Sequence, residues 1–218
     1  VVLEKPPQLA VHPTLNYPYD TLANGYAAWA AQQGISPVFR PVNRIDKDTS
    51  GLVLAAKHAY AAPLLARNVE KLYYAVVEGE LPLGPGVIDA PIGRHPRERK
   101  RMAVVPDGRG AVTHWRVLAR FGTHTLLSVA LETGRTHQIR VHMAYIRHPV
   151  TGDDVYGASR RQLGLAGQAL HGYRLRLTHP SSGEEMVFYA PLPAYFVAAL
   201  QKLGWDGDAE SAKEFMRT

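Results

Sequence analysis

A charged turn between two apolar runs is the stretch that most constrains how this chain folds. It reads NRIDKDTSG from Asn43 to Gly51, with VFRPV before it and LVLAA after it. Short apolar runs next to turn residues are typical of strands, so the charged side chains are expected where strands meet a turn and not on a solvated helix. Turns held between buried strands are common positions for active sites, so this stretch is the first candidate.

The rest of the pattern predicts an α+β fold built on a mixed, largely antiparallel sheet flanked by helices. No repeat, low-complexity tract or clear linker interrupts it, so we expect one domain over residues 1–218. Strands are expected at 52–57, 73–79, 112–119, 124–131, 173–178 and 185–190, and helices at 20–33, at 59–69, between Gly134 and His148, and at 194–203.

Local signals predict where the helices begin and end. Asp20 is expected to cap the first helix and Gly34 to end it, because short polar side chains bind free N–H groups and glycine adopts the left-handed conformation. Thr136 is expected to cap the third helix. Pro63 is expected to interrupt the second, because proline removes a backbone donor.

Composition limits the classes of function. The chain has no cysteine, which excludes thiol catalysis and thiolate metal sites and fits a reducing cytoplasm. No apolar run is long enough to cross a bilayer, and the first residues lack the order of a secretory signal, so we expect a cytoplasmic protein. The formal charge of +6 and a pI near 9.6 favour a polyanionic partner, nucleic acid before membrane.

The most basic segment runs from Gly93 to Gly110 and predicts a hairpin arm. Between residues 94 and 101 a single carboxylate, Glu98, stands against five cations: Arg94, Arg97, Arg99, Lys100 and Arg101. The sequence PDG at Pro106 to Gly108, which follows these cations, is a turn signal.

Two carboxylates in the opening turn raise the question of catalysis. Asp46 and Asp48 are two positions apart, and a carboxylate pair suggests chemistry at a glycosidic bond. The structural alternative is that Asp48, Thr49 and Ser50 satisfy the backbone donors of the turn. We prefer that alternative for Asp48, whereas for Asp46 the residues alone leave function and structure equally open.

Two arginines and two histidines later in the chain allow further sites. Arg135 and Arg140 could each pair with a buried carboxylate, hold a phosphate or lie on the surface, and the apolar neighbours of Arg140 favour its burial. His137 and His142 lie near two possible metal-ligating carboxylates, Asp153 and Asp154. Their spacing does not place them on one helix face and no HExxH motif is present, so structural histidines are preferred to a metal site. No nucleotide-binding glycine pattern and no GxSxG motif occurs.

Adjacent tyrosines open the strand expected at 73–79. Tyr73 and Tyr74 must face opposite ways, so one can enter the core while the other lines a cleft and stacks on a base. Ordinary strand aromatics are the alternative. The residues alone therefore predict a basic α+β protein that binds RNA, and they leave open whether it acts on a glycosidic bond.

Three segments, taken in order, resemble the RluA-type pseudouridine synthases, which isomerise uridine in RNA. They read NRIDKDTSGLVLAAK, KLYYAVVEG and TGRTHQIRVHMAYIRHPVTGDDVYG, and shorter matches occur at KPPQLAVHP, PIGRHP, LHGYRLRLTHP and APLP. The resemblance covers most of the chain. It departs at Asn43, where the family has histidine, and at Ile45, where it has leucine; no segment resembles the N-terminal S4-type RNA-binding domain of some members.

The resemblance implies the pseudouridine synthase fold with an RNA-binding cleft, a uridine substrate in ribosomal or transfer RNA, a monomer, and neither cofactor nor metal. It implies that Asp46 is the nucleophile, that Arg140 pairs with it and that Tyr73 stacks on the uracil. Arg44 would fill the gap left by the flipped base. The cations assigned to RNA phosphates are Arg94, Arg97, Arg99, Lys100, Arg101 and Arg135.

Two other functions stay open beside this one. The same basic surface would serve a catalytically silent RNA-binding or ribosome-assembly factor on the same fold. A nucleoside or glycoside hydrolase using Asp46 and Asp48 is the third option.

Overall fold

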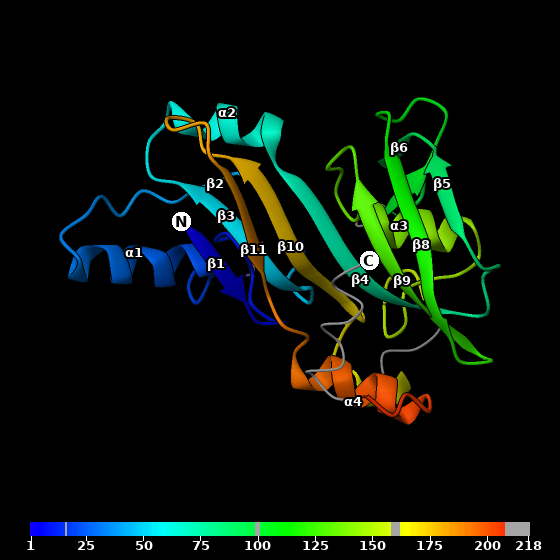
Figure 1. The fold of residues 1–218 in the computed structure, drawn as a ribbon. Coiled ribbons are helices and arrows are strands. Elements are labelled where there is room, and N and C mark those ends of the chain that lie inside the picture. Colours follow the sequence, from blue (N-terminus) through cyan, green and yellow to red (C-terminus); the bar gives the residue numbers. More distant parts are fainter. Residues whose placement is uncertain (16, 99–100, 158–161, 208–218) are drawn as a thin grey trace. The chain divides into compact units, whose positions relative to one another are not determined.

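The computed structural model describes residues 1–15, 17–98, 101–157 and 162–207 (Figure 1). It divides into two compact units, one formed by Val1–Lys71 with Arg174–Ala190 and the other by Leu72–Tyr173 with Pro191–Thr218. Two of the three divisions fall inside β4 (Glu70–Glu78) and β10 (Leu170–Thr178), and the third lies between Ala190 and Pro191.

The first unit is built around β3 (Ser50–Ala56), whose seven residues are all buried. β1 (Val2–Lys5) and the short β2 (Arg40–Pro41) pair with it antiparallel, and β11 (Glu185–Tyr189) pairs antiparallel with β10. Burial on both faces explains why β3 reads as a continuous apolar run. Its core contains Leu52, Leu54, Ala56, Leu65, Leu175, Leu177 and Ala190.

Two helices of this unit correct the sequence predictions. α1 (Leu22–Gln32) is capped by Thr21 and not by Asp20: Thr21 Oγ1 accepts from the Asn24 N–H, and the Asn24 side chain accepts in return from the Thr21 N–H. Gly34 follows the helix at a φ of 65°, as predicted. α2 (Ala61–Asn68) runs through Pro63 without interruption, because Pro63 lies in the first turn, where backbone N–H groups have no partner within the helix.

The second unit contains an antiparallel succession of β4, β9 (His124–Leu131), β8 (Val112–Arg120) and β5 (Pro85–Asp89). A separate hairpin joins β6 (Ile92–Arg94) to β7 (Met102–Val104), and α3 (Gln138–Tyr145) follows β9. A short 3-10 helix spans Gln162–Gly164.

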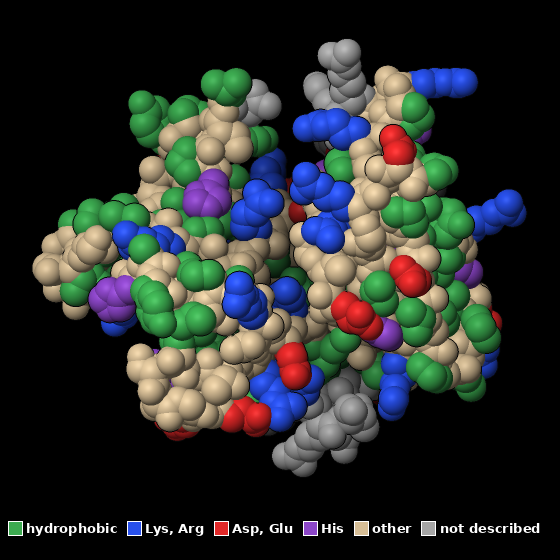
Figure 2. Space-filling view, turned by 90° about the horizontal axis from the view of Figure 1, so that it is seen from above, with side chains coloured by type: hydrophobic (Ala, Val, Ile, Leu, Met, Phe, Trp, Pro, Cys, Tyr) green, Lys and Arg blue, Asp and Glu red, His purple; other side chains and the backbone are tan. Residues whose placement is uncertain are grey.

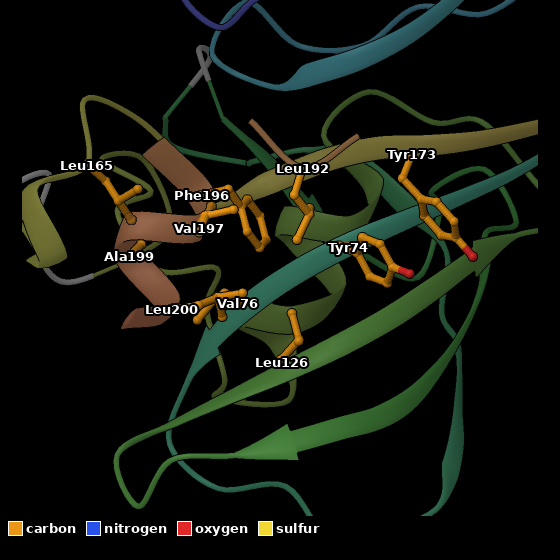
Figure 3. Packing of buried hydrophobic residues seen from close by; sticks show 11 residues of the cluster. Tyr74, Val76, Leu126, Leu165, Tyr173, Leu192, Phe196, Val197, Ala199 and Leu200 are labelled. Carbon is orange, nitrogen blue, oxygen red and sulfur yellow. The ribbon is translucent and has the colours of Figure 1, made fainter. Parts of the chain in front are cut away.

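The main core of this unit lies between its strands and α4 (Ala194–Lys202) (Figure 3). Phe196 and Leu200 of α4 are fully buried, with Val76 of β4 and Leu126 of β9 in the same cluster. The predicted α+β class and largely antiparallel sheet are confirmed by these pairings. The expectation of one catalytic domain over residues 1–218 stays a prediction.

Candidate active site

The Asp46 turn leads directly into β3 in the first unit. The Asp46 carbonyl accepts from the Thr49 N–H at 3.1 Å, which closes a turn over Lys47 and Asp48. Asp46 is half-buried, and Arg44 is exposed on its N-terminal side. The predicted charged turn at a strand end is confirmed, and it leaves the Arg44 side chain open to a partner.

Asn43 fixes the entry to this turn. Its side chain is buried, and its Nδ2 donates to the Leu52 carbonyl at 3.1 Å while its Oδ1 accepts from the Leu54 N–H at 2.7 Å. One amide thus satisfies a carbonyl and an N–H of β3. The residue that replaces the family histidine therefore has a structural role that its sequence position did not indicate.

A buried lysine lies behind the same turn. Lys5 is fully buried, and its Nζ donates to the carbonyls of Lys47 at 2.8 Å and Pro6 at 2.7 Å. Desolvation lowers the Lys5 pKa to about 8, although the negative charges of Asp48 and Asp46 act in the opposite direction. Lys5 was not among the predicted site residues, and its one signal in the sequence is a lysine at the end of the strand Val2–Lys5.

Lys47 turns toward an aromatic ring. Its Nζ donates to the Tyr17 hydroxyl at 2.9 Å and lies 4.6 Å from the ring centroid. An ammonium near an aromatic ring is attracted by the ring quadrupole. Lys47 is therefore directed to Tyr17 from the same turn that presents Asp46.

Arg140 of α3 forms a bidentate ion pair in the second unit. Its Nε lies 2.6 Å from Asp153 Oδ2 and one terminal nitrogen lies 2.8 Å from Asp153 Oδ1, with both side chains buried. Burial acts to raise the Asp153 pKa, but hydrogen bonds and charge from Arg140, with the N–H groups of Val155 and Tyr156, hold that pKa below its usual value. The predicted burial of Arg140 is confirmed. Asp153, considered above as a metal ligand, is its ion-pair partner.

The start of α3 differs from its prediction. His137, not Thr136, occupies the N-cap, with a φ of 56° and no capping hydrogen bond from its side chain. The buried Gln138 instead accepts from the Arg135 N–H at 2.9 Å and donates to the Val112 carbonyl at 3.0 Å. A long side chain anchored on β8 thus replaces the short capping residue.

His142 is a structural histidine, as predicted. It is fully buried, with Nδ1 at 2.8 Å from Thr113 Oγ1 and Nε2 at 3.0 Å from the Ala90 carbonyl. Desolvation lowers its pKa. Among the described residues, no group of three or more His, Asp or Glu side chains is arranged to hold a metal ion.

Tyr73 and Tyr74 occupy opposite faces of β4, and both are buried. Tyr74 stacks on Tyr173 at a centroid distance of 4.1 Å, within the core that Figure 3 shows. The prediction that one of the two tyrosines enters the core is confirmed for Tyr74. The stacking of Tyr73 on a base stays a prediction.

The basic arm is a hairpin, as predicted. Arg94 pairs in register with Met102, and Arg94 and Arg97 are exposed. Arg101 is half-buried and lies 3.0 Å from Glu98, while Arg99 and Lys100 lie outside the described residues. In the space-filling view of Figure 2, Lys and Arg side chains (blue) are exposed on the face shown.

Arg135 is exposed near the base of this hairpin. Its Nε donates to the Gly110 carbonyl at 2.9 Å, which anchors the guanidinium beside the segment that follows β7. Of the predicted site residues, Arg44 and Asp46 belong to the first unit, and Tyr73, Arg140 and Arg135 belong to the second.

None of the helices in the described ranges is long and apolar enough to span a membrane.

The sequence and the fold both match known proteins. The family model for RNA pseudouridylate synthase matches residues 1–145. An uncharacterized RNA pseudouridine synthase of Chloroflexus aurantiacus is 49% identical over 206 residues, which cover 91% of this chain and 65% of the relative. The ribosomal large subunit pseudouridine synthase D of Nitrosomonas europaea is 45% identical over 215 residues, covering 93% of this chain and 62% of that protein.

A solved structure agrees with these relatives. The human RNA pseudouridylate synthase domain containing 4 superimposes with a TM-score of 0.71 at 26% identity, covering 93% of this chain and 89% of that chain. The chain thus spans 65% and 62% of the two bacterial relatives named above. The resemblance read from the sequence is confirmed, and the chain belongs to the RNA pseudouridylate synthase family.

Proposed function

We propose that this protein is an RNA pseudouridine synthase that uses Asp46 as its nucleophile. The observation that carries the proposal is the Asp46 turn, a half-buried carboxylate between two strands, in a chain whose family match includes it. A buried lysine amine behind the turn hydrogen-bonds its backbone at Lys47. That hydrogen bond orients the chain around the carboxylate.

The chemistry is an isomerisation without net hydrolysis. Asp46 attacks the sugar C1′ or the base, the C1′–N1 bond breaks, the uracil turns, and the bond to Asp46 breaks as C5 bonds to C1′. C5 loses its proton and N1 gains one, so atoms and charge balance. The site must exclude water while the base is detached, and the uridine must first leave its stack.

Arg140, Tyr73 and Arg44 take the supporting roles. Arg140 pairs with Asp46 during the reaction and keeps it ionised and directed. Tyr73 stacks on the uracil and assists removal of the C5 proton. Arg44, exposed beside Asp46, takes the place of the flipped base.

The substrate class is structured RNA of the ribosome or transfer RNA. The Nitrosomonas relative is named for the large ribosomal subunit, and the net charge of +6 suits a polyanion. The exposed arginines of the hairpin hold phosphates without reading sequence. The protein acts as a monomer in the cytoplasm and needs neither cofactor nor metal.

The test is release of tritium from uracil C5. Purified protein is incubated with unmodified cellular RNA labelled at that position, and release is counted over time. We expect release with the wild type and none with Asp46→Asn. Asp48→Asn, in the same turn, is the matched control and should remain active. No release by the wild type, with RNA binding intact, would support the catalytically silent factor and overturn the proposal.

A further inference from the structure

Tyr156 links the basic hairpin to the helix that carries Arg140. Its ring lies 5.1 Å from the Arg140 guanidinium carbon and 5.3 Å from that of Arg101. Each distance is within the range in which a guanidinium is attracted to an aromatic ring. One side chain therefore contacts a cation of the hairpin arm and the buried arginine of α3.

The Tyr156 hydroxyl makes a second connection between the same elements. It accepts from the Met102 N–H of β7 at 2.9 Å and lies 3.0 Å from Nδ1 of His137. Because a backbone N–H can only donate, the hydroxyl oxygen accepts from Met102, and the direction of its hydrogen bond with His137 Nδ1 depends on the histidine tautomer.

His137 is the residue on which the start of α3 depends. It has a φ of 56° and a ψ of 22°, in the left-handed region that costs a non-glycine residue about 1 kcal/mol. Its carbonyl accepts from the Val141 N–H at 2.9 Å, a bond of the first helical turn, which contains Arg140. The hydroxyl of Tyr156 contacts this strained residue through its ring.

The backbone of Tyr156 is also tied to the partner of Arg140. Its N–H donates to Asp153 Oδ1 at 3.1 Å, the oxygen that a terminal nitrogen of Arg140 binds. A shift of Tyr156 therefore moves the helix start, the ring beside the guanidinium and the carboxylate that holds it. Such groups commonly orient the residues that touch a substrate.

We propose that Tyr156 is a positioning residue through which RNA held on the β6–β7 hairpin sets the orientation of Arg140. This rests on the proposed role of Arg140 in the reaction. Tyr156 acts through Arg140 and does not touch the reacting atoms. RNA bound to the hairpin therefore promotes the reaction as well as adding affinity.

The test separates the reaction rate from RNA binding. Tyr156→Phe removes the hydroxyl and keeps the ring, and single-turnover tritium release is measured at saturating RNA with binding measured separately. We expect the rate to fall about tenfold or more while the RNA dissociation constant changes less than about threefold. Tyr145→Phe, in which an exposed tyrosine of α3 loses its hydroxyl, is the matched control and should keep the wild-type rate.

A double-variant cycle tests the connection to the hairpin. Arg97→Gln should lower both affinity and saturated rate in the wild type, but affinity alone in Tyr156→Phe, because the hydrogen bonds of the hydroxyl to Met102 and His137 are already lost. Equal losses of saturated rate in both backgrounds would overturn the proposal, as would a wild-type rate in Tyr156→Phe. An inactive wild type would instead contradict the proposed function.

A second variant covers the case in which Tyr156→Phe does not fold. His137→Asn removes the same hydrogen bond from the other side, and asparagine tolerates the left-handed conformation. We expect the same loss of rate with binding preserved. Failure of both variants to fold would assign the hydrogen bond to stability alone and overturn the positioning role.

Discussion

Lys5 is an uncommon choice for a buried position, because a buried ammonium loses its hydration. Its two backbone acceptors and the nearby charges of Asp46 and Asp48 offset part of that loss, yet its pKa still falls to about 8. A neutral amine retains two N–H groups, enough for both carbonyls. The charged form is therefore less favourable in the folded protein than in the unfolded chain.

The stability of the protein should rise with pH because of this lysine. Below pH 8 the folded protein carries the unfavourable charge in full; between pH 8 and 10.5 the unfolded chain binds more protons than the folded one, so the penalty fades. From pH 7 to 9.5 the wild type should gain about 2 kcal/mol relative to Lys5→Met. Urea unfolding of both proteins at both pH values measures this, and parallel pH profiles would contradict it.

The Arg140 ion pair allows structure and catalysis to be separated. Arg140→Ala should abolish tritium release, leave RNA binding largely intact and lower the free energy of unfolding by about 3 kcal/mol, because Asp153 is left buried without its partner. Adding Asp153→Asn should restore part of the stability, since no unpaired charge stays buried, but no activity. Near-normal turnover in Arg140→Ala would show that its assigned role is wrong.

The hairpin cations should differ in what they do for RNA. Neutralising Arg97, Arg99 and Lys100 should weaken RNA binding. The slope of the logarithm of the binding constant against the logarithm of the salt concentration should become shallower by about 0.7 for each phosphate that the protein no longer neutralises. Arg101→Gln should change the slope less, because Arg101 is already engaged by Glu98 and Tyr156. Filter binding across a salt series measures this, with the exposed Arg176→Gln as the control. An unchanged slope in the triple variant would remove the hairpin from the RNA surface.

Most elements could be predicted from the sequence because strands and hairpins leave local patterns. Helix ends were harder: the predicted caps at Asp20 and Thr136 each lie one residue before the true N-cap. At α1 the deciding interaction is the reciprocal one with Asn24, and at α3 it is the reach of Gln138 to β8. The second interaction joins segments far apart in sequence, which a local pattern does not show.

The candidate site, like the helix ends, could be predicted only in part from the sequence. The burial of Arg140 could be predicted from its apolar neighbours, and the turn around Asp46 from its flanking runs. Lys5, Asn43 and the pairing of Arg140 with Asp153 were missed. Each of these depends on how distant segments meet, or on a polar side chain becoming buried, so neither composition nor spacing indicates it.

At the scale of the whole molecule, we expect turnover to be independent of metal ions. The proposed chemistry uses a carboxylate nucleophile and no Lewis acid. Dialysis against a chelator should leave the single-turnover rate on a short unstructured RNA unchanged, which avoids effects of metal on RNA folding. A rate that is lost on chelation and restored by a divalent ion would contradict this.

The hydrogen bond between Lys5 and Lys47 also bears on the order in which the protein assembles. It spans 42 residues, and the strand that ends at Lys5 must dock on β3 before the amine reaches the carbonyl. The turn that presents Asp46 therefore reaches its final shape only after this long loop closes. Refolding followed by tritium release should recover activity no faster than β1 becomes protected from hydrogen exchange.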